Sequence, residues 1–356
     1  MKVILETHRL ILREYTMEDF DELYAILSDP ETMRHYPAPY DEKGVARWLT
    51  WSLNNYKTCG FGLWAIQLKE NGQFIGDCGI TMQSIDGESL PEIGYHIHKD
   101  QWRKGYAKEA ATAVRDWFFT HTDYAAVYSY MKYTNLPSYA TAASLGMRRV
   151  KEYPDPKDGI CYVYRITRKE WKKRTFRTLQ TQRLLLRPWR EEDAETLYQY
   201  AKEPEVGIPA GWMPHTSPEH SREILRTVLR KPTVFAVCLK DGTPMGNIHL
   251  NFETDMSDRE DECELGYWLG KPFWGQGIIP EAARELLRYA FEELGVNAVW
   301  CGRYDGNEKS RRVQEKLGFV YHHTTHGLEV PDGLRTGHVM LMTRETWETI
   351  YRKETI

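Results

Sequence analysis

The chain has 356 residues, the length of two ordinary domains rather than one. It is 41% hydrophobic and 28% charged, which excludes a disordered chain, and its net charge of -4 gives no positive field for holding a nucleic acid. The six cysteines form no C-x-x-C pair, which fits a reducing, cytoplasmic setting without a disulfide framework. Glu6 interrupts the first apolar residues and no run of 18 apolar residues follows, so we expect neither export nor a membrane span.

The sequence contains an internal repeat. The segment RLILREYTMED that begins at Arg9 is answered by RLLLRPWREED at Arg183, an offset of 174 residues. The tetrapeptides EIGY at Glu92 and ELGY at Glu264 match at an offset of 172, and further motifs follow in the same order. A repeat of this length in unchanged order indicates two complete domains, head to tail.

The predicted domains cover residues 1–173 and 174–356, and the polar, basic stretch at the join is interpreted as a surface linker. Each copy has the pattern of a mixed α/β domain: a short strand, a helix with one apolar face, a β-hairpin, a strand, a glycine-bearing turn and a further helix. A strand, another helix and a last strand pair complete each copy. The first helix, which Thr16 can cap, is expected to carry its apolar stripe at Phe20, Leu23, Tyr24 and Leu27, and its counterpart at Ala194, Leu197, Tyr198 and Ala201. The hairpin turns are expected at 71–72 and 241–242, the helices after the glycine turns from Lys108 and from about Pro280, and the next strands over 126–130 and 298–302.

The strand, turn and helix that follow Glu92 and Glu264 are the most informative segment. A turn with little side chain at a helix N-terminus lets backbone N–H groups and the helix dipole approach a phosphate closely. An ordinary capping turn also needs glycine, so the spacing alone leaves both interpretations open. Neither a P-loop motif nor a dinucleotide fingerprint in its proper context occurs, and ATP and NAD are therefore not indicated. The turn residues are Trp102, Arg103, Lys104, Gly105, Tyr106 and Ala107 in the first copy, and Trp274, Gly275, Gln276, Gly277, Ile278 and Ile279 in the second.

The ordered set of motifs, present twice, resembles the GNAT N-acetyltransferase superfamily and, within it, the RimJ/RimL type, which includes ribosomal-protein N-terminal acetyltransferases. The set comprises E-(I/L)-G-Y, Trp-x-x-Gly, Glu-Ala in the following helix, Asn-x-x-Ser, Leu-Gly-(Met/Phe) and a closing Thr-Arg with tryptophan. The resemblance covers essentially all of both halves. It implies an acetyl-CoA co-substrate, no metal, and an amine acceptor.

The resemblance also implies roles for individual residues. The two glycine-bearing turns would bind the pyrophosphate of acetyl-CoA, and the strand before each turn would pair its backbone with the pantetheine arm. Two asparagines would contact the cofactor, and two serines occupy a position proposed to protonate the departing thiolate. The strand residues are Tyr95, His96 and Ile97, and Tyr267, Trp268 and Leu269; the asparagines are Asn135 and Asn307; the serines are Ser138 and Ser310.

The transfer chemistry needs a base independently of any family. An alkyl amine with a pKa of about 10 is almost wholly protonated at pH 7, so its attack on a thioester needs a proton acceptor. Glu92 and Glu264 are the candidates, because each lies on the strand that would run beside the thioester. Alternatively, each carboxylate only forms a pair within the sheet, and each serine only caps a helix.

Both copies depart from the usual superfamily pattern. Many members carry a tyrosine as general acid seven residues after the asparagine, where this chain has Ala142 and Gln314. In the second copy Ile279 stands where the turn motif usually ends in Gly or Ala, and in the first copy Met147 replaces the usual aromatic residue. These departures leave the identity of the general acid open. They also motivate an alternative function, in which one or both copies bind acetyl-CoA without transferring its acetyl group.

Three further features bear on the acceptor or on a metal. The tryptophans Trp48, Trp51 and Trp212 lie where such a domain builds its acceptor pocket, although core packing is the simpler explanation for each. The acidic run 253–264 in the second copy would attract a cationic acceptor, or it is a solvated loop. The histidines near 322–326 lack a carboxylate to complete a metal site, and we expect none.

The sequence therefore predicts two tandem α/β domains that transfer acetyl groups from acetyl-CoA to a primary amine, directly, in a ternary complex. The acceptor would be a small amine or a protein N-terminus, and the second copy is favoured as the catalytic one because its element from Asn307 to Phe319 is the more complete. No nucleic acid or membrane partner is expected. The oligomeric state is not predicted.

Overall fold

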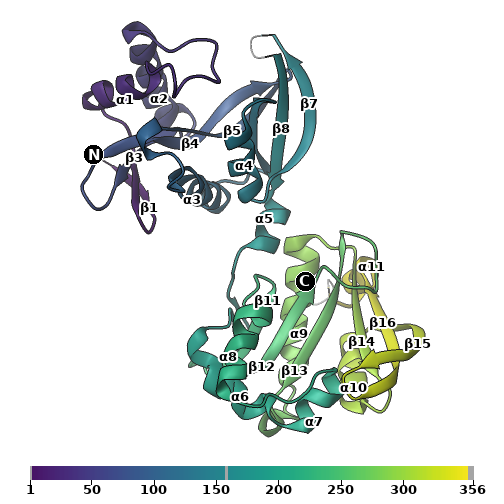
Figure 1. Cartoon of the computed structure of the whole chain (residues 1–356). Coiled ribbons are helices and arrows are strands. Elements are labelled where there is room, and N and C mark those ends of the chain that lie inside the picture. Colours follow the sequence, from purple (N-terminus) through teal and green to yellow (C-terminus); the bar gives the residue numbers. More distant parts are fainter. Residues whose placement is uncertain (1, 157–158, 352–356) are drawn as a thin grey trace. The chain divides into compact units, whose positions relative to one another are not determined.

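The computed structural model describes residues 2–156 and 159–351. The chain folds into two compact units, Met1–Trp171 and Lys172–Ile356, called the N-terminal half and the C-terminal half below (Figure 1). Each half is a single eight-stranded sheet with helices on both faces. The strands and helices follow the same order in the two halves. This confirms the two mixed α/β domains predicted from the sequence repeat.

The N-terminal half begins with two short strands and two helices before the hairpin. Its strands are β1 (Val3–Glu6), β2 (Leu10–Arg13), β3 (Leu63–Leu68), β4 (Phe74–Ile85), β5 (Glu88–Ile97), β6 (Ala126–Lys132), β7 (Arg148–Asp155) and β8 (Gly159–Thr167). Its helices are α1 (Phe20–Leu27), α2 (Glu42–Thr58), α3 (Tyr106–His121) and α4 (Leu136–Ser144), and α5 (Arg168–Arg174) runs across the boundary between the halves.

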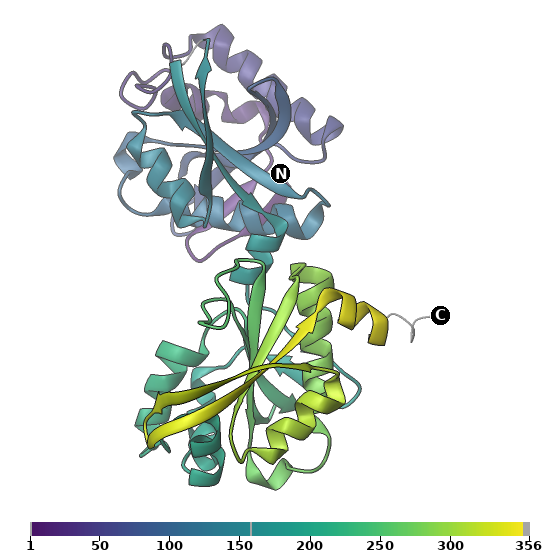
Figure 2. The same ribbon diagram turned by 90° about the vertical axis from the view of Figure 1, so that its right-hand side faces the viewer.

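The C-terminal half repeats this order. Its strands are β9 (Leu179–Gln180), β10 (Leu184–Arg187), β11 (Val234–Leu239), β12 (Pro244–Asn251), β13 (Glu262–Leu269), β14 (Ala298–Tyr304), β15 (Val320–Val330) and β16 (Gly333–Thr343). Its α-helices are α6 (Ala194–Ala201), α7 (Pro204–Gly207), α8 (Pro218–Ile224), α9 (Ile278–Arg288), α10 (Glu308–Leu317) and α11 (Arg344–Tyr351). The last two strands form a long twisted pair that leads into α11 (Figure 2).

One pair of strands in each sheet is parallel, and all other neighbours are antiparallel. The sheet orders are β1-β2-β3-β4-β5-β6-β8-β7 and β15-β16-β14-β13-β12-β11-β10-β9. The parallel pairs are β5 with β6 and β13 with β14. A parallel connection needs a crossover, and α3 and α9 supply it in the two halves.

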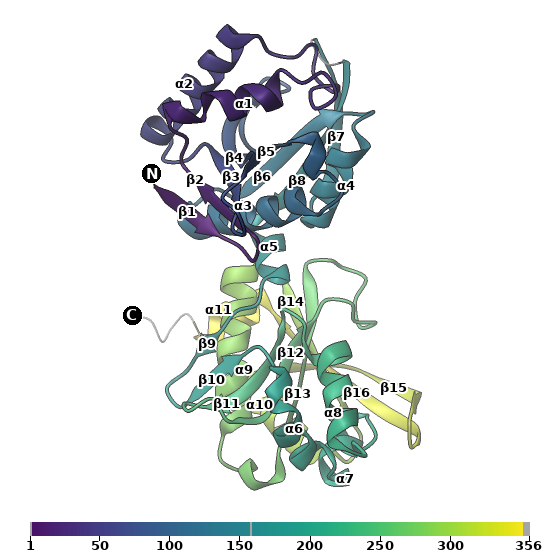
Figure 3. The same cartoon turned by 60° about the vertical axis from the view of Figure 1, so that its left-hand side comes forward.

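Two apolar layers hold each half together, one on each face of its sheet. In the N-terminal half α3 packs on one face through Ala111, Val114 and Phe118, while α1 and α2 cover the other through Leu23 and Leu49 (Figure 3). In the C-terminal half α9 covers one face, and α6 and α8 cover the other. The apolar stripe predicted for the long helix of the second copy is fully buried: Ala283, Leu286, Leu287, Ala290 and Phe291.

The starting points predicted for the two crossover helices were wrong by about two residues. α3 begins at Tyr106 rather than Lys108, and α9 begins at Ile278 rather than near Pro280. The reason is that Gly105 and Gly277, in the left-handed region at φ of 81° and 73°, are themselves the N-cap residues. The helix therefore starts immediately after the glycine, and Pro280 lies in its first turn, where its missing N–H leaves no hydrogen bond unmade.

Candidate active site

The two parallel strands of each half part immediately beyond the predicted base. In the N-terminal half the parallel register consists of Glu92 opposite Tyr128, and in the C-terminal half it ends at Glu264 opposite Trp300. Beyond these positions the strands of each pair continue but no longer pair with each other. The result is a gap in the middle of each sheet, with a carboxylate at its apex.

Both carboxylates are partly buried, and burial raises the pKa of each. The pKa of Glu92 rises to about 8 because of desolvation, which the main chain of Tyr130 only partly offsets by hydrogen bonding to the carboxylate. Burial also raises the pKa of Glu264, although Thr254 Oγ1 donates to its carboxylate at 3.0 Å. A carboxylic acid of this kind is a better match to an amine than an ordinary glutamate, because its proton affinity is closer to that of the amine.

The strand before each turn directs alternate amides into this gap. The His96 N–H donates to the Asp77 carboxylate on the neighbouring strand, at 3.1 Å, so the amide of His96 is engaged within the protein. Successive amides of a strand point to opposite neighbours, and those of Tyr95 and Ile97 therefore point toward the gap. The Ile97 carbonyl accepts a hydrogen bond from Trp102 Nε1 at 2.7 Å, and Leu269 and Trp274 repeat this bond at 2.7 Å.

The glycine-bearing turns present unblocked helix N-termini. No side chain caps α3 or α9, so the first N–H groups of both helices remain available to a ligand. Arg103 and Gly275 occupy the same position in the two turns, and both have a left-handed backbone, with φ of 61° and 76°. The N-terminal half thus has the charged Arg103 at a position where the C-terminal half has Gly275, the residue type that a left-handed backbone favours. Such a turn at a helix N-terminus fits a pyrophosphate.

A clamp that the sequence analysis missed holds each turn in place. Arg9 Nε donates to the Glu109 carboxylate at 2.7 Å, and its Nη1 donates to the Lys104 carbonyl at 2.9 Å. Arg183 makes the same contacts with Glu281, at 2.6 Å, and with the Gln276 carbonyl, at 3.3 Å. The signal was present in the repeated Arg-Leu and Glu-Ala motifs, but these residues are about a hundred positions apart in the sequence and nothing local connects them.

The asparagines and serines of the Asn-x-x-Ser motifs lie at the N-termini of α4 and α10. Asn135 Oδ1 accepts from the Ser138 N–H at 3.2 Å, and Asn307 Oδ1 accepts from the Ser310 N–H at 3.1 Å, so both asparagines are helix N-caps. The two serines are in contact with the strand tyrosines: Ser138 Oγ lies 3.0 Å from Tyr95 Oη, and Ser310 Oγ lies 2.9 Å from Tyr267 Oη. The asparagine side chains therefore cap these helices, and the serine hydroxyls do not.

The face of the first sheet that α1 and α2 cover carries a series of hydrogen-bonded polar side chains. Asp77 accepts hydrogen bonds from Tyr15 Oη and from His96 Nδ1, both at 2.8 Å, and His96 Nε2 lies 2.7 Å from Tyr36 Oη. Burial raises the pKa of Tyr36, and the charge of Glu92 adds to this rise. Trp48, which was predicted to line the pocket for the acceptor amine, packs edge-on against His96 with ring centroids 5.5 Å apart and therefore lies beside these polar side chains.

The second sheet has different chemistry at the same positions. Asn247 replaces Asp77 and accepts from Trp189 Nε1 at 2.8 Å, and Trp268 replaces His96. Trp212, which was predicted to line the acceptor pocket of the second copy, packs against Trp268 with ring centroids 5.9 Å apart. The His249 ring lies directly over Gly266: a Cβ at that glycine would come within 2.5 Å of the imidazole. At the matching Gly94 of the first sheet a Cβ would meet nothing nearer than 3.7 Å, so the surroundings of the strand glycine are more crowded in the second sheet.

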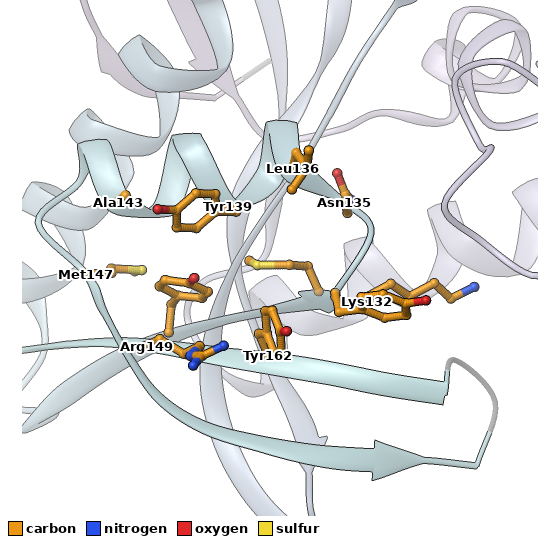
Figure 4. Close-up of a pocket in the computed structure, with 11 residues that line it drawn as sticks. Lys132, Asn135, Leu136, Tyr139, Ala143, Met147, Arg149 and Tyr162 are labelled. Carbon is orange, nitrogen blue, oxygen red and sulfur yellow. The ribbon is translucent and has the colours of Figure 1, made fainter.

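A pocket of about 500 Å³ lies beneath α4 in the N-terminal half (Figure 4). Its walls include Asn135, Tyr139, Arg149 and Tyr162, but they do not include the candidate base Glu92. The pocket is thus adjacent to the Asn-x-x-Ser turn and separate from the apex of the gap.

Neither a metal site nor a membrane span occurs in the part of the chain that the structure describes. No group of three or more His, Cys, Asp or Glu side chains within residues 2–156 and 159–351 is placed to hold a metal ion. Of the histidines weighed above, His322 and His323 contact each other through their Nδ1 atoms at 2.7 Å on the exposed strand β15. No helix among the same residues is long and apolar enough to cross a membrane.

Several known proteins each match less than half of this chain. YkkB of Bacillus subtilis is 35% identical over 153 residues, which are 42% of this chain and 88% of that protein. The N-acetyltransferase p20 of Bacillus licheniformis is 31% identical over 166 residues, which are 45% of this chain and 92% of that protein. YdaF of Bacillus subtilis, which carries the provisional name of a ribosomal N-acetyltransferase, is 48% identical over 82 residues, or 23% of this chain and 43% of that protein.

An acetyltransferase crystal structure from Agrobacterium tumefaciens C58 is 30% identical, covering 46% of this chain and 92% of that one with a TM-score of 0.40. The family model described as an acetyltransferase (GNAT) domain matches residues 9–148 and again residues 183–320. These two matches span most of both halves and contain every candidate catalytic and cofactor-binding residue named above. The chain therefore belongs to the GNAT family of acetyl-CoA-dependent N-acetyltransferases, as two tandem copies of its domain.

Proposed function

We propose that each half is a separate acetyltransferase site, in which acetyl-CoA occupies the gap between the parting parallel strands. The observation that carries this is the position of Glu92 and Glu264, each with a raised pKa, at the last paired position before the gap. The glycine-bearing turns would take the pyrophosphate on their free N–H groups. The amides of Tyr95 and Ile97 would pair with the pantetheine arm, and their counterparts Tyr267 and Leu269 would do the same.

The chemistry is a direct transfer between the two bound substrates. The amine nitrogen forms a bond to the thioester carbonyl carbon and loses a proton to the glutamate carboxylate, directly or through one water. The carbon–sulfur bond then breaks, the thiolate takes a proton from Ser138 or Ser310, and the serine regains a proton that derives from water. A covalent acetyl-enzyme is not needed, and of the cysteines only Cys59 is exposed.

We infer that the two halves take different amines. The face around Glu92 carries the Asp77–His96–Tyr36 chain and Trp48, whose Nε1 is buried and makes no hydrogen bond within the described residues. The corresponding face around Glu264 is built from tryptophans and a buried imidazole. Asp255, from the acidic run, is close enough to Glu264 to raise its pKa, so a cationic amine is favoured there.

Transfer is tested with acetyl-CoA that carries a heavy-isotope acetyl group. The full chain is incubated with this cofactor and a cell extract, and products that gain the label are identified by mass spectrometry. A labelled small amine or protein N-terminus supports transfer and distinguishes the two acceptor classes. Bound acetyl-CoA without any labelled product would instead support a protein that binds the cofactor and does not transfer its acetyl group.

A further inference from the structure

The Ser310 hydroxyl in the C-terminal half is approached by two polar groups. Tyr267 Oη lies 2.9 Å from Ser310 Oγ, and Gln314 Nε2 lies 3.4 Å from it. The orientation of the Gln314 amide follows from its other neighbours, because its nitrogen also lies 3.2 Å from the Gly302 carbonyl, which can only accept. An amide nitrogen only donates, so Ser310 Oγ is the acceptor in that bond.

The direction of the Ser310 proton follows from these contacts. When Tyr267 also donates to it, Ser310 Oγ accepts two hydrogen bonds within the protein and its own proton is left for a third partner. The serine is the third residue of α10, at the positive end of the helix dipole. A proton donor at this place suits a sulfur atom that becomes negative as the thioester bond breaks.

Packing alone does not account for Gln314. Its side chain is fully buried, yet its Oε1 has no hydrogen-bond partner within the described residues. A buried amide oxygen without a partner lowers stability relative to an apolar side chain of similar size. Gln314 Nε2 also lies 3.1 Å from Cys301 Sγ, so its two N–H groups are shared among three acceptors, Cys301 Sγ, the Gly302 carbonyl and Ser310 Oγ, while its oxygen has none.

The N-terminal half lacks this second donor. Tyr95 Oη lies 3.0 Å from Ser138 Oγ and 3.1 Å from the Ser138 carbonyl, much as Tyr267 Oη lies 3.4 Å from the Ser310 carbonyl, but Ala142 occupies the position of Gln314. The hydroxyl proton of Ser138 is therefore less firmly directed than that of Ser310. Ala142 and Gln314 therefore allow the two halves to be compared at this position.

We propose that Tyr267 and Gln314 are positioning residues that direct the Ser310 proton toward the departing sulfur of acetyl-CoA, a role that rests on the proposed function. As the carbon–sulfur bond breaks, the thiolate takes the Oγ proton of Ser310, and Ser310 takes the hydroxyl proton of Tyr267. Water then returns a proton to Tyr267, while the proton from the amine has gone to Glu264. In the N-terminal half Tyr95 acts alone on Ser138.

The test uses the full chain with one half silenced. In the Glu92→Gln background, which leaves the C-terminal site intact, we expect Gln314→Met to lower kcat about 5-fold and Tyr267→Phe to lower it about 100-fold. The KM for acetyl-CoA should stay within about 2-fold in both variants, since neither residue is placed in the pyrophosphate turn. In the Glu264→Gln background, Ala142→Gln should raise the kcat of the N-terminal site.

Several outcomes would overturn the inference, and they are separable from failure of the proposed function. An unchanged kcat in both variants, or a KM that rises in step with a falling kcat, would show that the two residues do not act on the leaving group. Melting temperatures report any loss of folding, and Ser310→Ala combined with Tyr267→Phe should be no slower than the slower single variant, because the two groups act as one unit. If the unmodified chain binds acetyl-CoA but transfers no acetyl group to any amine, the proposed function itself is contradicted.

Discussion

At the scale of single residues, the raised pKa of Glu92 leads to a pH dependence. A carboxyl group accepts a proton only when it is ionised, and burial shifts the ionisation of Glu92 to a pH of about 8. We therefore expect kcat/KM of the N-terminal site to rise with pH through about 8, with a further rise near pH 10 as the free amine forms. The profile is measured in the Glu264→Gln background. A profile that stays flat between about pH 6 and pH 9 would contradict Glu92 as the base.

Arg103 combines an unfavourable backbone with a useful charge. Its φ of 61° is disfavoured for an L-residue by about 1 kcal/mol or more, while Gly275 occupies the same position in the second turn without that cost. We expect Arg103→Gly to be more stable than Arg103→Ala by about 1 kcal/mol in urea unfolding. Both variants should raise the KM for acetyl-CoA equally, because both lose the guanidinium. An Arg103→Gly variant with unchanged KM would exclude a role for this charge.

At the scale of elements, a buried ion pair connects each second strand to the first helix of its half. The Arg13 guanidinium binds both oxygens of Asp19 at 2.7 and 2.6 Å, and both side chains are less than a tenth exposed. Asp19→Asn would leave the Arg13 charge buried and unpaired, and should lower the free energy of unfolding by about 3 to 5 kcal/mol. The matched control is Lys2→Ala, which removes the exposed ion pair with Glu14. This variant should change the free energy of unfolding by less than about 1 kcal/mol.

The same pair predicts acid sensitivity. Burial by itself would raise the pKa of Asp19, but the hydrogen bonds from Arg13 and Thr16 outweigh it, and the net pKa is lowered. A carboxylate whose pKa is lower in the folded state contributes stability above its unfolded pKa of about 4, and that contribution is lost as the pH falls further. The difference in unfolding free energy between the parent and Asp19→Asn should therefore shrink below about pH 4. A constant difference down to pH 2 would contradict the pairing.

Elements with a local signal could be predicted from the sequence. The hairpin turns at Asn71-Gly72 and Asp241-Gly242, the apolar stripe of α9 and the glycine turns all follow from residues that are near neighbours in the chain. The exact helix starts could not, because the left-handed glycine that ends each turn is also the helix cap. The starts predicted at Lys108 and near Pro280 were therefore about two residues too late.

The predicted site was incomplete where its contacts join distant segments. The hydrogen bonds from Asp77 through His96 to Tyr36 join β4 and β5 to the loop between α1 and α2, and the Arg9–Glu109 clamp spans a hundred residues. The interaction of Gln314 with Ser310 is local, yet the sequence showed only that the usual tyrosine is missing. Which polar atoms meet depends on sheet register and helix orientation, and neither is encoded in a short motif.

At the scale of the whole molecule, the duplication predicts two independent sites. Each half has its own gap, its own glutamate and its own glycine-bearing turn. We expect two molecules of acetyl-CoA per chain in calorimetric titration, and Arg103→Gly should weaken only one of the two. Arg183→Ala, which removes the clamp on the second turn, should weaken the other. A stoichiometry of one would mean that only one half binds the cofactor.

The most direct test of the account compares label transfer from heavy-acetyl acetyl-CoA by four versions of the full chain: the parent, Glu92→Gln, Glu264→Gln and the double variant. All four should bind acetyl-CoA, because neither glutamate is in the pyrophosphate turn. We predict that each single variant loses a different subset of the labelled amines and that the double variant labels none at neutral pH. A double variant that labels the same amines at the parental rate would contradict the central claim that these two carboxylates are the bases of two acetyltransferase sites.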